Sequence, residues 1–266
     1  MNEDLIPLQH FSGAETLGQR ARIKAQKILY YLATGYWNTG ERLHPLFVTN
    51  NYVNHLRVYQ FVSQFTLGKQ ALDVGCGVGY GTALLGRTAT RAVGIDLSEI
   101  ALSEIAVNEA FRLYPEGEFL PMDAEKMDFP SQSFDVIIST ENFEHLPHQQ
   151  AHVAELARVV RKDGFCFIAT PNPELFAGLN NPFHTKENTY SELRDLLQKR
   201  FREVDILEPI RVPVNPAGRS AREERFARGE HGKLPSPDLE IFGRKVDQTF
   251  LSNTHSFQCF ARHPIE

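Results

Sequence analysis

The stretch Ala71-Leu72-Asp73-Val74-Gly75-Cys76-Gly77-Val78-Gly79-Tyr80-Gly81 joins an apolar segment to a glycine-rich turn and carries the strongest structural signal in the chain. Three glycines without Cβ atoms let a ligand lie directly against the turn and the first amides of a following helix. A dinucleotide-binding turn has glycines at its first, third and sixth positions, and the sixth position counted from Gly75 is Tyr80. The spacing therefore argues against a dinucleotide site.

Asp73 lies two residues before the turn, and its charge indicates which kind of ligand the turn binds. A carboxylate at this point repels the pyrophosphate of a dinucleotide and attracts a cationic ligand. S-adenosylmethionine meets this requirement because it carries an ammonium and a sulfonium group and has no phosphate. The stretch resembles motif I of the class I S-adenosylmethionine-dependent methyltransferases. On that resemblance we expect Asp73, Gly75, Gly77 and Gly79 to bind the methyl donor.

The composition narrows the class of protein further. With 266 residues, 42% of them hydrophobic and 23% charged, the chain fits one α/β domain with additions. No apolar run approaches the ~18 to 20 residues that a membrane span needs. The net charge of -5 lacks the basic excess of a nucleic-acid-binding protein, and the acidic start of the chain lacks the features of a signal peptide. We therefore expect a cytoplasmic protein with a small-molecule partner such as a sugar, a phenol or another metabolite.

Cysteine usage agrees with a reducing compartment. The three cysteines, Cys76, Cys166 and Cys259, are far apart and have no metal-type spacing. We expect them to be reduced, buried thiols without a catalytic role.

From residue 69 onward, short apolar runs alternate with helical patterns, as in a parallel sheet with helices on both faces. Strands are predicted at residues 71–74, 92–95, 118–120, 134–138, 165–169, 201–207 and 257–262, and helices through Leu84 and Leu85, from Ser98, at 149–160 and at 191–199. Pro171 is expected to stop the strand at 165–169, because proline cannot continue the ladder. These elements predict an α/β, Rossmann-like, seven-stranded and mostly parallel sheet; the methyltransferase resemblance makes its last strand antiparallel.

Two segments are predicted to be additions to this sheet. Residues 1–68 are expected to form an N-terminal helical extension or lid, with one helix around residues 17–32 and a second at 51–65. An aromatic turn at Tyr36-Trp37-Asn38-Thr39-Gly40 either lines a pocket or packs in a core. The methyltransferase domain, residues 69–266, carries an insertion at about 208–248 that is rich in proline and arginine. This insertion is either a lid or binding loop, or a solvated arm.

Acids at successive strand ends predict the rest of the cofactor site. Asp96 follows the turn by about twenty residues, where a carboxylate accepts hydrogen bonds from the hydroxyls of a ribose. The resemblance implies that Leu97 packs beside the base, that Asp123 accepts the adenine amino group, and that the Ala124 amide meets a ring nitrogen. Alternatively, Asp123 is a turn residue that bonds the local backbone. Together with Asp73, these acids predict one crevice at the carboxyl edge of the sheet.

The segment Ser139-Thr140-Glu141-Asn142-Phe143-Glu144-His145-Leu146 follows the fourth predicted strand and lies beyond the expected methionine end of the cofactor, which Glu141 is expected to border. If the segment is helical, Glu141, Glu144 and His145 share one face. His145 is a candidate general base, because its unperturbed pKa of ~6.5 suits proton transfer from a hydroxyl. In the alternative, Glu144 orients or caps, and His145 bonds a loop carbonyl. His184, which follows the fifth strand, is a further catalytic candidate.

The pattern Glu-x-x-Glu-His with a later histidine resembles the metal site of the small-RNA 3′-terminal 2′-O-methyltransferases, and ubiquinone-pathway O-methyltransferases carry a similar motif. This resemblance implies a divalent metal on Glu141, Glu144, His145 and His184. The mixed oxygen and nitrogen set suits Mn, Fe, Co or Zn better than Mg. Such a metal would bind vicinal oxygens of the acceptor and lower a hydroxyl pKa. Alternatively, His184 faces the substrate without a metal.

The sequence thus predicts an S-adenosylmethionine-dependent methyltransferase that acts on a small molecule, with a hydroxyl as the favoured acceptor. Residues 181–193 and His55-Leu56-Arg57-Val58-Tyr59 also resemble bacterial methyltransferases associated with glycans and secondary metabolites. One alternative is an NAD-dependent oxidoreductase, which Tyr80 and Asp73 oppose. Another is a noncatalytic S-adenosylmethionine-binding module. An RNA acceptor is disfavoured by the acidic balance of the chain.

Overall fold

The computed structural model describes residues 50–97, 118–173, 181–207, 238–241, 244–247 and 256–265, together with Gly18, Ala21, Arg22, Lys24, Ala25, Ile28 and Leu43. The six described residues between 18 and 28 are helical, in agreement with the predicted first helix. The helix predicted from Ser98, the aromatic turn at residues 36–40 and the proline-rich and arginine-rich part of the insertion lie outside the described residues.

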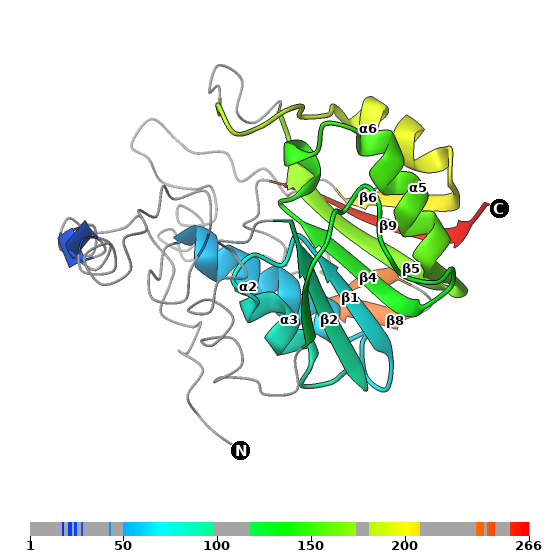
Figure 1. Cartoon of the computed structure of the whole chain (residues 1–266), viewed down its shortest axis with the longest axis horizontal. Helices are drawn as coiled ribbons and strands as arrows, with labels where there is room; N and C mark the ends of the chain where they lie inside the picture. The colour runs from blue at the N-terminus through cyan, green and yellow to red at the C-terminus, as the bar shows by residue number, and fades with distance from the viewer. Residues whose placement is uncertain are drawn as a thin grey trace, which may run out of the picture.

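A seven-stranded sheet forms the centre of the molecule, with the strand order β3-β2-β1-β4-β5-β9-β6 (Figure 1). Its strands are β1 (Gln70–Val74), β2 (Arg91–Asp96), β3 (Glu118–Pro121), β4 (Phe134–Thr140), β5 (Val160–Pro171), β6 (Phe201–Leu207) and β9 (Ser256–Pro264). The pairs from β3 to β5 are parallel, whereas β9 runs antiparallel to both of its neighbours, β5 and β6. The predicted fold class, with its antiparallel last strand, is confirmed.

Helices cover both faces of the sheet, as the alternation of short apolar runs with helical patterns predicts. The helices α5 (Gln149–Val159) and α6 (Tyr190–Gln198) pack on one face, and α2 (Asn50–Ser63) and α3 (Tyr80–Leu85) on the other (Figure 1). In β1, Leu72 contributes to the core beneath α5 and α6, while its neighbour Ala71 contributes to the core beneath α2 and α3. Every second strand residue therefore faces the same layer of helices.

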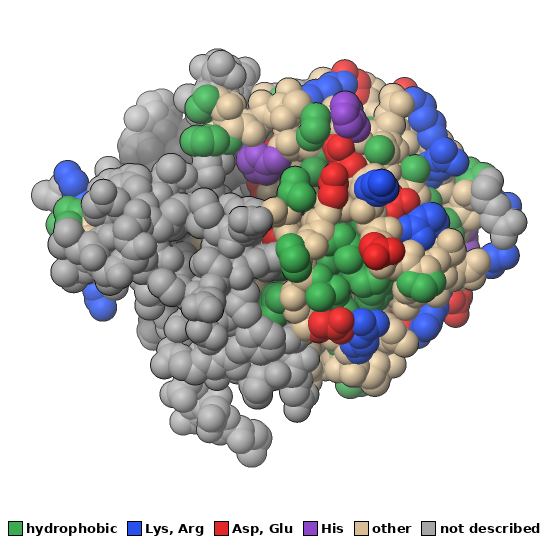
Figure 2. Space-filling model, viewed as in Figure 1, with side chains coloured by type: hydrophobic (Ala, Val, Ile, Leu, Met, Phe, Trp, Pro, Cys, Tyr) green, Lys and Arg blue, Asp and Glu red, His purple; other side chains and the backbone are tan. Residues whose placement is uncertain are grey.

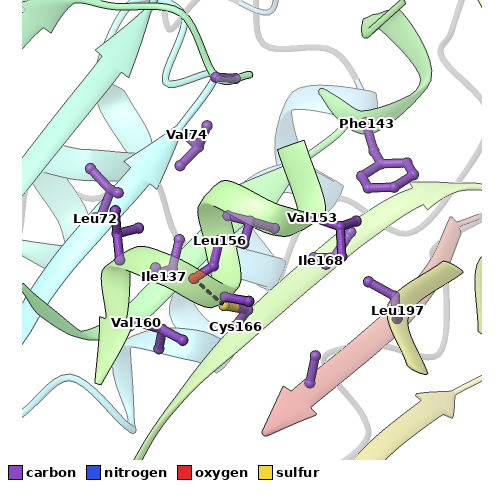
Figure 3. Packing of buried hydrophobic residues seen from close by; sticks show 14 of the residues in the cluster. Leu72, Val74, Ile137, Phe143, Val153, Leu156, Val160, Cys166, Ile168 and Leu197 are labelled. Atoms are coloured by element: carbon purple, nitrogen blue, oxygen red, sulfur yellow. Dashed lines mark hydrogen bonds between the residues drawn. The ribbon is translucent and has the colours of Figure 1, made fainter. Parts of the chain in front are cut away.

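The core on the α5 and α6 side is built from aliphatic and aromatic side chains, which come from the strands, both helices and η2 at Phe143 (Figure 3). Leu72, Ile137 and Ile168 are fully buried there beside Leu156 of α5. The Cys166 thiol lies in the same layer, with its sulfur 3.9 Å from the carbonyl oxygen of Leu156. The three cysteines are free and buried, as the sequence predicts.

The core on the other face draws in the helix that precedes the glycine turn. Phe61 and Val62 of α2 are fully buried, and the Phe61 ring packs against Phe167 of β5 and Phe260 of β9. This part of the predicted extension therefore shares a hydrophobic core with the sheet. The predicted boundary between the extension and the methyltransferase domain, at residue 68, therefore does not divide this hydrophobic core.

Two local predictions are corrected. The strand predicted at 165–169 is longer at both ends, and Pro171 pairs with Ser256 of β9 instead of ending the ladder at Ala169. Pairing with β4 ends at Ala169, so Pro171 lies beyond the doubly paired part of β5, where proline is tolerated. Within the insertion, for which the sequence indicated no periodicity, β7 (Asp238–Ile241) and β8 (Arg244–Asp247) form an antiparallel pair.

The surface of the described part is mixed in charge. Figure 2 shows acidic and basic side chains interspersed on one face, rather than gathered by sign. One such pair joins β2 to β3, where Arg91 lies 2.8 Å from Glu118. Among the described helices, none combines the length and the apolar character that crossing a membrane requires.

Two glycines of α3 provide a matched test of how α2 docks. A Cβ atom on Gly81 would lie 2.1 Å from Cζ of Tyr59, whereas one on Gly86 would meet nothing nearer than 3.5 Å. We expect Gly81→Ala to lower the free energy of unfolding by roughly 1 to 3 kcal/mol, because α2 must shift. Gly86→Ala, at a helical φ of -59°, should leave it unchanged or raise it by about 0.4 to 1 kcal/mol. Urea denaturation checks both, and equal stability of the two variants would contradict this account.

Candidate active site

A cavity of about 610 Å³ opens at the carboxyl ends of the central strands, a size that suits a cofactor together with part of a small acceptor. Open α/β sheets bind ligands at this edge. Its walls come from α2, the glycine turn, the end of β2, the segment after β4 and residues 181–187. A cavity therefore lies at the predicted edge of the sheet, and Asp96 is the one of the three predicted acids that lines it.

The glycine turn needs glycine for two reasons. Gly75, Gly77 and Gly79 have φ values of 75°, 55° and 81°, in the left-handed region that L-residues with side chains disfavour. A Cβ atom on Gly75 would also lie 2.5 Å from the side chain of Asn142. Gly75 and Gly77 line the cavity, and Gly79 caps α3. The turn thus brings the segment after β4 directly against the predicted cofactor site.

The other predicted cofactor residues, which follow β2 and β3, do not all line the cavity. Asp96 lines the cavity, and its Oδ2 accepts a hydrogen bond of 2.9 Å from the Gly77 amide. Leu97 is 70% exposed. Oδ1 of Asp123 accepts a hydrogen bond of 2.8 Å from the Glu125 amide, which is the local backbone contact expected if Asp123 is a turn residue. Asp123 and the buried Ala124 are not among the residues that line the cavity. Their contacts with adenine stay predictions.

Asp73 is fully buried behind the turn and does not line the cavity. Its carboxylate accepts hydrogen bonds from the Tyr59 hydroxyl at 2.9 Å and the Thr82 hydroxyl at 2.7 Å. Burial raises the pKa of Asp73 to about 6, and the Asp96 charge adds to this rise, while the two hydroxyl bonds oppose it. The direct ligand contact predicted for Asp73 is therefore not offered by this arrangement. Its charge acts through the turn, and Tyr59 lines the cavity instead.

The segment after β4 forms only a single 3₁₀ turn, η2 (Phe143–His145). Glu141 precedes it in the left-handed region, with a φ of 48°, so the hypothesis that Glu141, Glu144 and His145 share one helical face is wrong. Glu141 still lines the cavity, and burial together with the neighbouring Glu144 raises its pKa to about 8. Glu144 is 1% exposed, and its Oε2 accepts a hydrogen bond of 3.0 Å from the Thr170 hydroxyl.

The ring orientation of His145 is set by a backbone carbonyl. Nδ1 of His145 lies 2.9 Å from the Phe183 carbonyl oxygen. A carbonyl only accepts, so Nδ1 carries the proton and the lone pair of the neutral ring is on Nε2. Nε2 lies 3.8 Å from Oε1 of Glu144. Two acceptors that face each other in this way favour a proton or a cation between them.

His184 has the same tautomer for a different reason. Asn181 accepts the Phe183 amide on its Oδ1, so its Nδ2 is the atom 2.9 Å from Nε2 of His184. Nε2 therefore accepts, and Nδ1 donates to Oε1 of Glu187 at 2.5 Å. The rings of His145 and His184 lie 5.0 Å apart at an interplanar angle of 81°.

These groups fit a divalent metal. Glu144, His145 and His184 each offer a ligand atom, and within the described part of the chain these atoms lie within 4.8 Å of one another. Each histidine binds an oxygen acceptor through its second nitrogen, as metal-ligating histidines do. One carboxylate and two imidazoles suit Mn, Fe, Co or Zn. Glu141, the fourth predicted ligand, does not join this group.

Several residues of the site were not singled out by their chemistry in the sequence. His55 and Tyr59 of α2 line the cavity, as do Asn142 and Glu187. The spacing of His55 and Tyr59 places them one helical turn apart, which is a signal that the sequence contained. Glu187 is recognisable only from its hydrogen bond to His184.

A buried chain of hydrogen bonds connects the two halves of the site. Nδ2 of Asn142 donates to the Ser139 hydroxyl at 3.2 Å, which lies 3.3 Å from Nε2 of His152. Nδ1 of His152 donates to the Ala124 carbonyl oxygen at 2.9 Å. His152 is fully buried, and this burial lowers its pKa to about 4. The chain links the segment after β4 to the turn predicted to hold adenine.

Comparisons with known proteins agree with the fold. Residues 72–168 match the family model of the methyltransferase domain. A S-adenosylmethionine-dependent methyltransferase from Archaeoglobus fulgidus, compared by structure, gives a TM-score of 0.54 at 18% identity, over 80% of this chain and 94% of that one. The described sheet therefore has the fold of this methyltransferase, and residues 72–168 within it are similar to the methyltransferase domain.

Two curated relatives are similar in sequence over part of their length. A probable S-adenosylmethionine-dependent methyltransferase of Mycolicibacterium smegmatis is 34% identical over 173 residues, which are 63% of this chain and 65% of the relative. A ubiquinone biosynthesis O-methyltransferase of Coxiella burnetii is 32% identical over 142 residues, which are 53% of this chain and 58% of the relative. The matched part thus spans less than two thirds of either relative.

The buried His152 predicts an acid-dependent loss of stability. Its pKa is about 4 in the folded protein and ~6.5 when unfolded, so its contribution is complete above pH 6.5 and is lost as the pH falls toward 4. Both proteins are compared at pH 7 and at pH 4.5. We expect the free energy of unfolding of the wild type to fall by roughly 2 to 3 kcal/mol more over this range than that of His152→Gln. Gln retains a donor for Ala124 and does not titrate.

Urea denaturation at the two pH values measures this difference. His148→Gln is the matched control, because His148 is exposed and its replacement should leave the pH dependence unchanged. The same pH dependence in the wild type and His152→Gln would show that His152 does not titrate in this range.

Proposed function

We propose that the protein transfers the methyl group of S-adenosylmethionine to a hydroxyl group of a small molecule. The observation that carries this proposal is the convergence of Glu144, His145 and His184 within 4.8 Å, on the same cavity as the glycine turn and Asp96. A hydroxyl needs a proton acceptor or a metal to become a good nucleophile, and these groups offer either. An amine, which attacks from its neutral form, needs less help.

The transfer is an in-line displacement. The acceptor oxygen forms a bond to the methyl carbon, the carbon–sulfur bond breaks, and its electron pair stays on sulfur as the sulfonium becomes a neutral thioether. The proton of the hydroxyl goes to the unprotonated Nε2 of His145, or to that of His184 once it releases the hydrogen bond from Asn181. The protein contributes mainly by aligning the two reactants and by excluding water from the cavity.

The three convergent ligand atoms support a metal-assisted form of this reaction. Glu144, His145 and His184 would hold the ion, and the bound ion would lower the pKa of a coordinated hydroxyl. The Phe183 carbonyl and the Glu187 carboxylate would keep both imidazoles in the ligating tautomer. Resemblance to the small-RNA and ubiquinone-pathway enzymes points the same way, and the curated Coxiella relative is named an O-methyltransferase.

The charge of the cavity favours a neutral acceptor. Among its described lining residues are four acids, Asp96, Glu141, Glu144 and Glu187, and no lysine or arginine. These acids disfavour phosphorylated acceptors, nucleic acids and the pyrophosphate of NAD, because the phosphate groups of all three are negatively charged and would be repelled by the carboxylates. Neutral hydroxyl compounds such as sugars and phenols fit best. A cytoplasmic location remains part of this proposal.

The acceptor class is tested with S-adenosylmethionine labelled on its methyl group and a panel of sugars, catechols and amines. We expect label to enter hydroxyl compounds, because the site provides groups that take their proton. The products are identified by mass spectrometry. Label in amines alone would refute a hydroxyl acceptor, and binding of the cofactor without turnover on any compound would indicate a noncatalytic module.

The metal is tested separately with Glu144→Gln, His184→Ala and Glu187→Gln. Elemental analysis and Mn²⁺ titration should show loss of the ion in the first two variants, which remove a ligand. Glu187→Gln should weaken Mn²⁺ binding about 10- to 100-fold, as for other groups that orient a ligating histidine. The control is Glu203→Gln, a surface acid that pairs with Arg262, which should bind metal like the wild type.

Full activity of metal-free wild type would exclude metal assistance. In that case the same variants decide the role of His184. Loss of activity in His184→Ala would then assign it as a proton acceptor or a substrate-binding residue without a metal.

A further inference from the structure

The cavity has a second pair of polar side chains, on a wall that the proposed reaction does not use. The Tyr80 hydroxyl lies 3.1 Å from Nδ1 of His55, and both residues line the cavity. His55 comes from α2, whereas Tyr80 is the first residue of α3, directly after the glycine turn. The pair therefore joins α2 to the turn that is predicted to hold the cofactor.

The position of this pair is fixed by packing. The Tyr80 ring meets Tyr52 edge-on at 4.9 Å and Tyr59 at 5.9 Å between ring centroids. Tyr59 is itself held by its hydrogen bond to the buried Asp73. Burial also lowers the pKa of His55 to about 4 and raises that of Tyr80, so both side chains are neutral near pH 7.

A neutral His55–Tyr80 pair presents one hydrogen-bond donor to a ligand in either of its two arrangements. If the Tyr80 hydroxyl donates to Nδ1, then Nε2 of His55 carries the second, outward N–H. If Nδ1 of His55 donates to the Tyr80 oxygen, the Tyr80 O–H is the group left to donate. The pair thus matches a ligand oxygen that accepts hydrogen bonds.

The strand order shows which part of the ligand lies nearest to this pair. Asp96, expected at the ribose, ends β2, and the convergent groups expected at the acceptor follow β4 and β5. The glycine turn after β1 lies between them in the sheet, and α2 and α3 cover it. A ligand that spans this edge from ribose to acceptor places its methionine end at the turn.

The methionine end is a zwitterion, and its two charges need different partners. Asp73 and Asp96 favour its ammonium group. Its carboxylate needs donors, and the described lining residues include no lysine or arginine to supply them. Uncharged donors suffice, because the amino acid end as a whole is neutral.

We infer that His55 and Tyr80 form the subsite that binds the methionine carboxylate of S-adenosylmethionine. This inference rests on the proposed function only in taking S-adenosylmethionine as the ligand of the cavity. It also gives α2 a role in the site, since that helix then closes the cofactor end of the cavity. The same donor chemistry would suit an oxygen of the methyl acceptor, so the experiment separates the two sources.

Two ligands that differ only in the amino acid end provide the test. S-adenosylhomocysteine contains the carboxylate, whereas 5′-methylthioadenosine keeps the adenosine and the thioether and lacks it. Calorimetry on the full chain compares the wild type with Tyr80→Phe and His55→Ala. We expect each variant to bind S-adenosylhomocysteine about tenfold more weakly or worse, and 5′-methylthioadenosine within about twofold of the wild type.

The variants include controls for packing. Tyr80→Phe keeps the ring that contacts Tyr52 and Tyr59, so loss of the hydroxyl is isolated from loss of packing. Tyr190→Phe is the matched control, because it removes a hydroxyl from α6, where the ring packs on Phe257 outside the cavity. The double variant should lose less than the product of the two single losses, since both disturb one bond.

The inference is overturned if both ligands weaken by the same factor, since the pair would then support the fold or the adenosine. It is also overturned if both ligands bind as in the wild type while the KM for the methyl acceptor rises, because the pair would then bind the acceptor. A wild type that binds neither ligand would refute both this subsite and the proposed cofactor. The expected binding pattern without methyl transfer to any hydroxyl would refute the proposed reaction and leave the subsite established.

Discussion

The buried carboxylate of Asp73 is the constraint on which the arrangement of the site depends. An isolated carboxylate in a protein interior is strongly unfavourable, and this one is made tolerable by hydroxyl donors from Tyr59 and Thr82. Those two donors belong to α2 and α3, so one side chain of β1 fixes both helices that cover this face of the sheet. Gly81 completes the contact, because any side chain there would displace the Tyr59 ring. The helix before the turn is thereby made part of the cavity.

The side of the cavity that is expected to bind the methyl acceptor is ordered differently. There, hydrogen-bond acceptors determine which ring nitrogen of His145 and of His184 carries the proton. The Phe183 carbonyl and the Glu187 carboxylate each bind an Nδ1–H, which leaves both Nε2 atoms unprotonated. Nε2 of His145 faces the buried Glu144, and Nε2 of His184 accepts a hydrogen bond from Asn181. The segment 181–187 supplies both of these constraints. It also closes on η2 through its backbone, because the Thr185 amide donates to the Glu144 carbonyl oxygen. The site proposed for proton removal or metal binding is therefore built from two chain segments, neither of which is a regular helix.

The sequence predicted what local pattern determines. The short apolar runs of the strands, the glycine turn and the acid at the end of β2 are each readable within a few residues, and the antiparallel last strand follows from the family resemblance. The failures concern residues whose environment is set by distant parts of the chain. Asp73 carries a charge that suits a cationic ligand, yet Tyr59, which lies fourteen residues earlier, turns it into a buried anchor. Glu141 has helical spacing with Glu144 and His145, but its left-handed φ removes it from their face. Pro171 stays in β5 because only one neighbouring strand, β9, still pairs with β5 at that position.

Charge repulsion within the site gives the bound sulfonium a specific role. Asp73 has a pKa raised to about 6 and Glu141 to about 8, in both cases first by burial and then by a neighbouring acid. Positive charge brought into the cavity opposes both effects, since it stabilises the ionised form of each nearby acid. Methyl transfer removes that charge, because the sulfonium becomes a neutral thioether while the amino acid end is unchanged. If the ligand is S-adenosylmethionine, the acids would favour the methyl donor over its demethylated product, whereas the proposed subsite of His55 and Tyr80 would face a carboxylate that both carry. Under the two proposals, discrimination between donor and product would arise from the electrostatics of the acids, and affinity for both would arise from the uncharged pair of His55 and Tyr80.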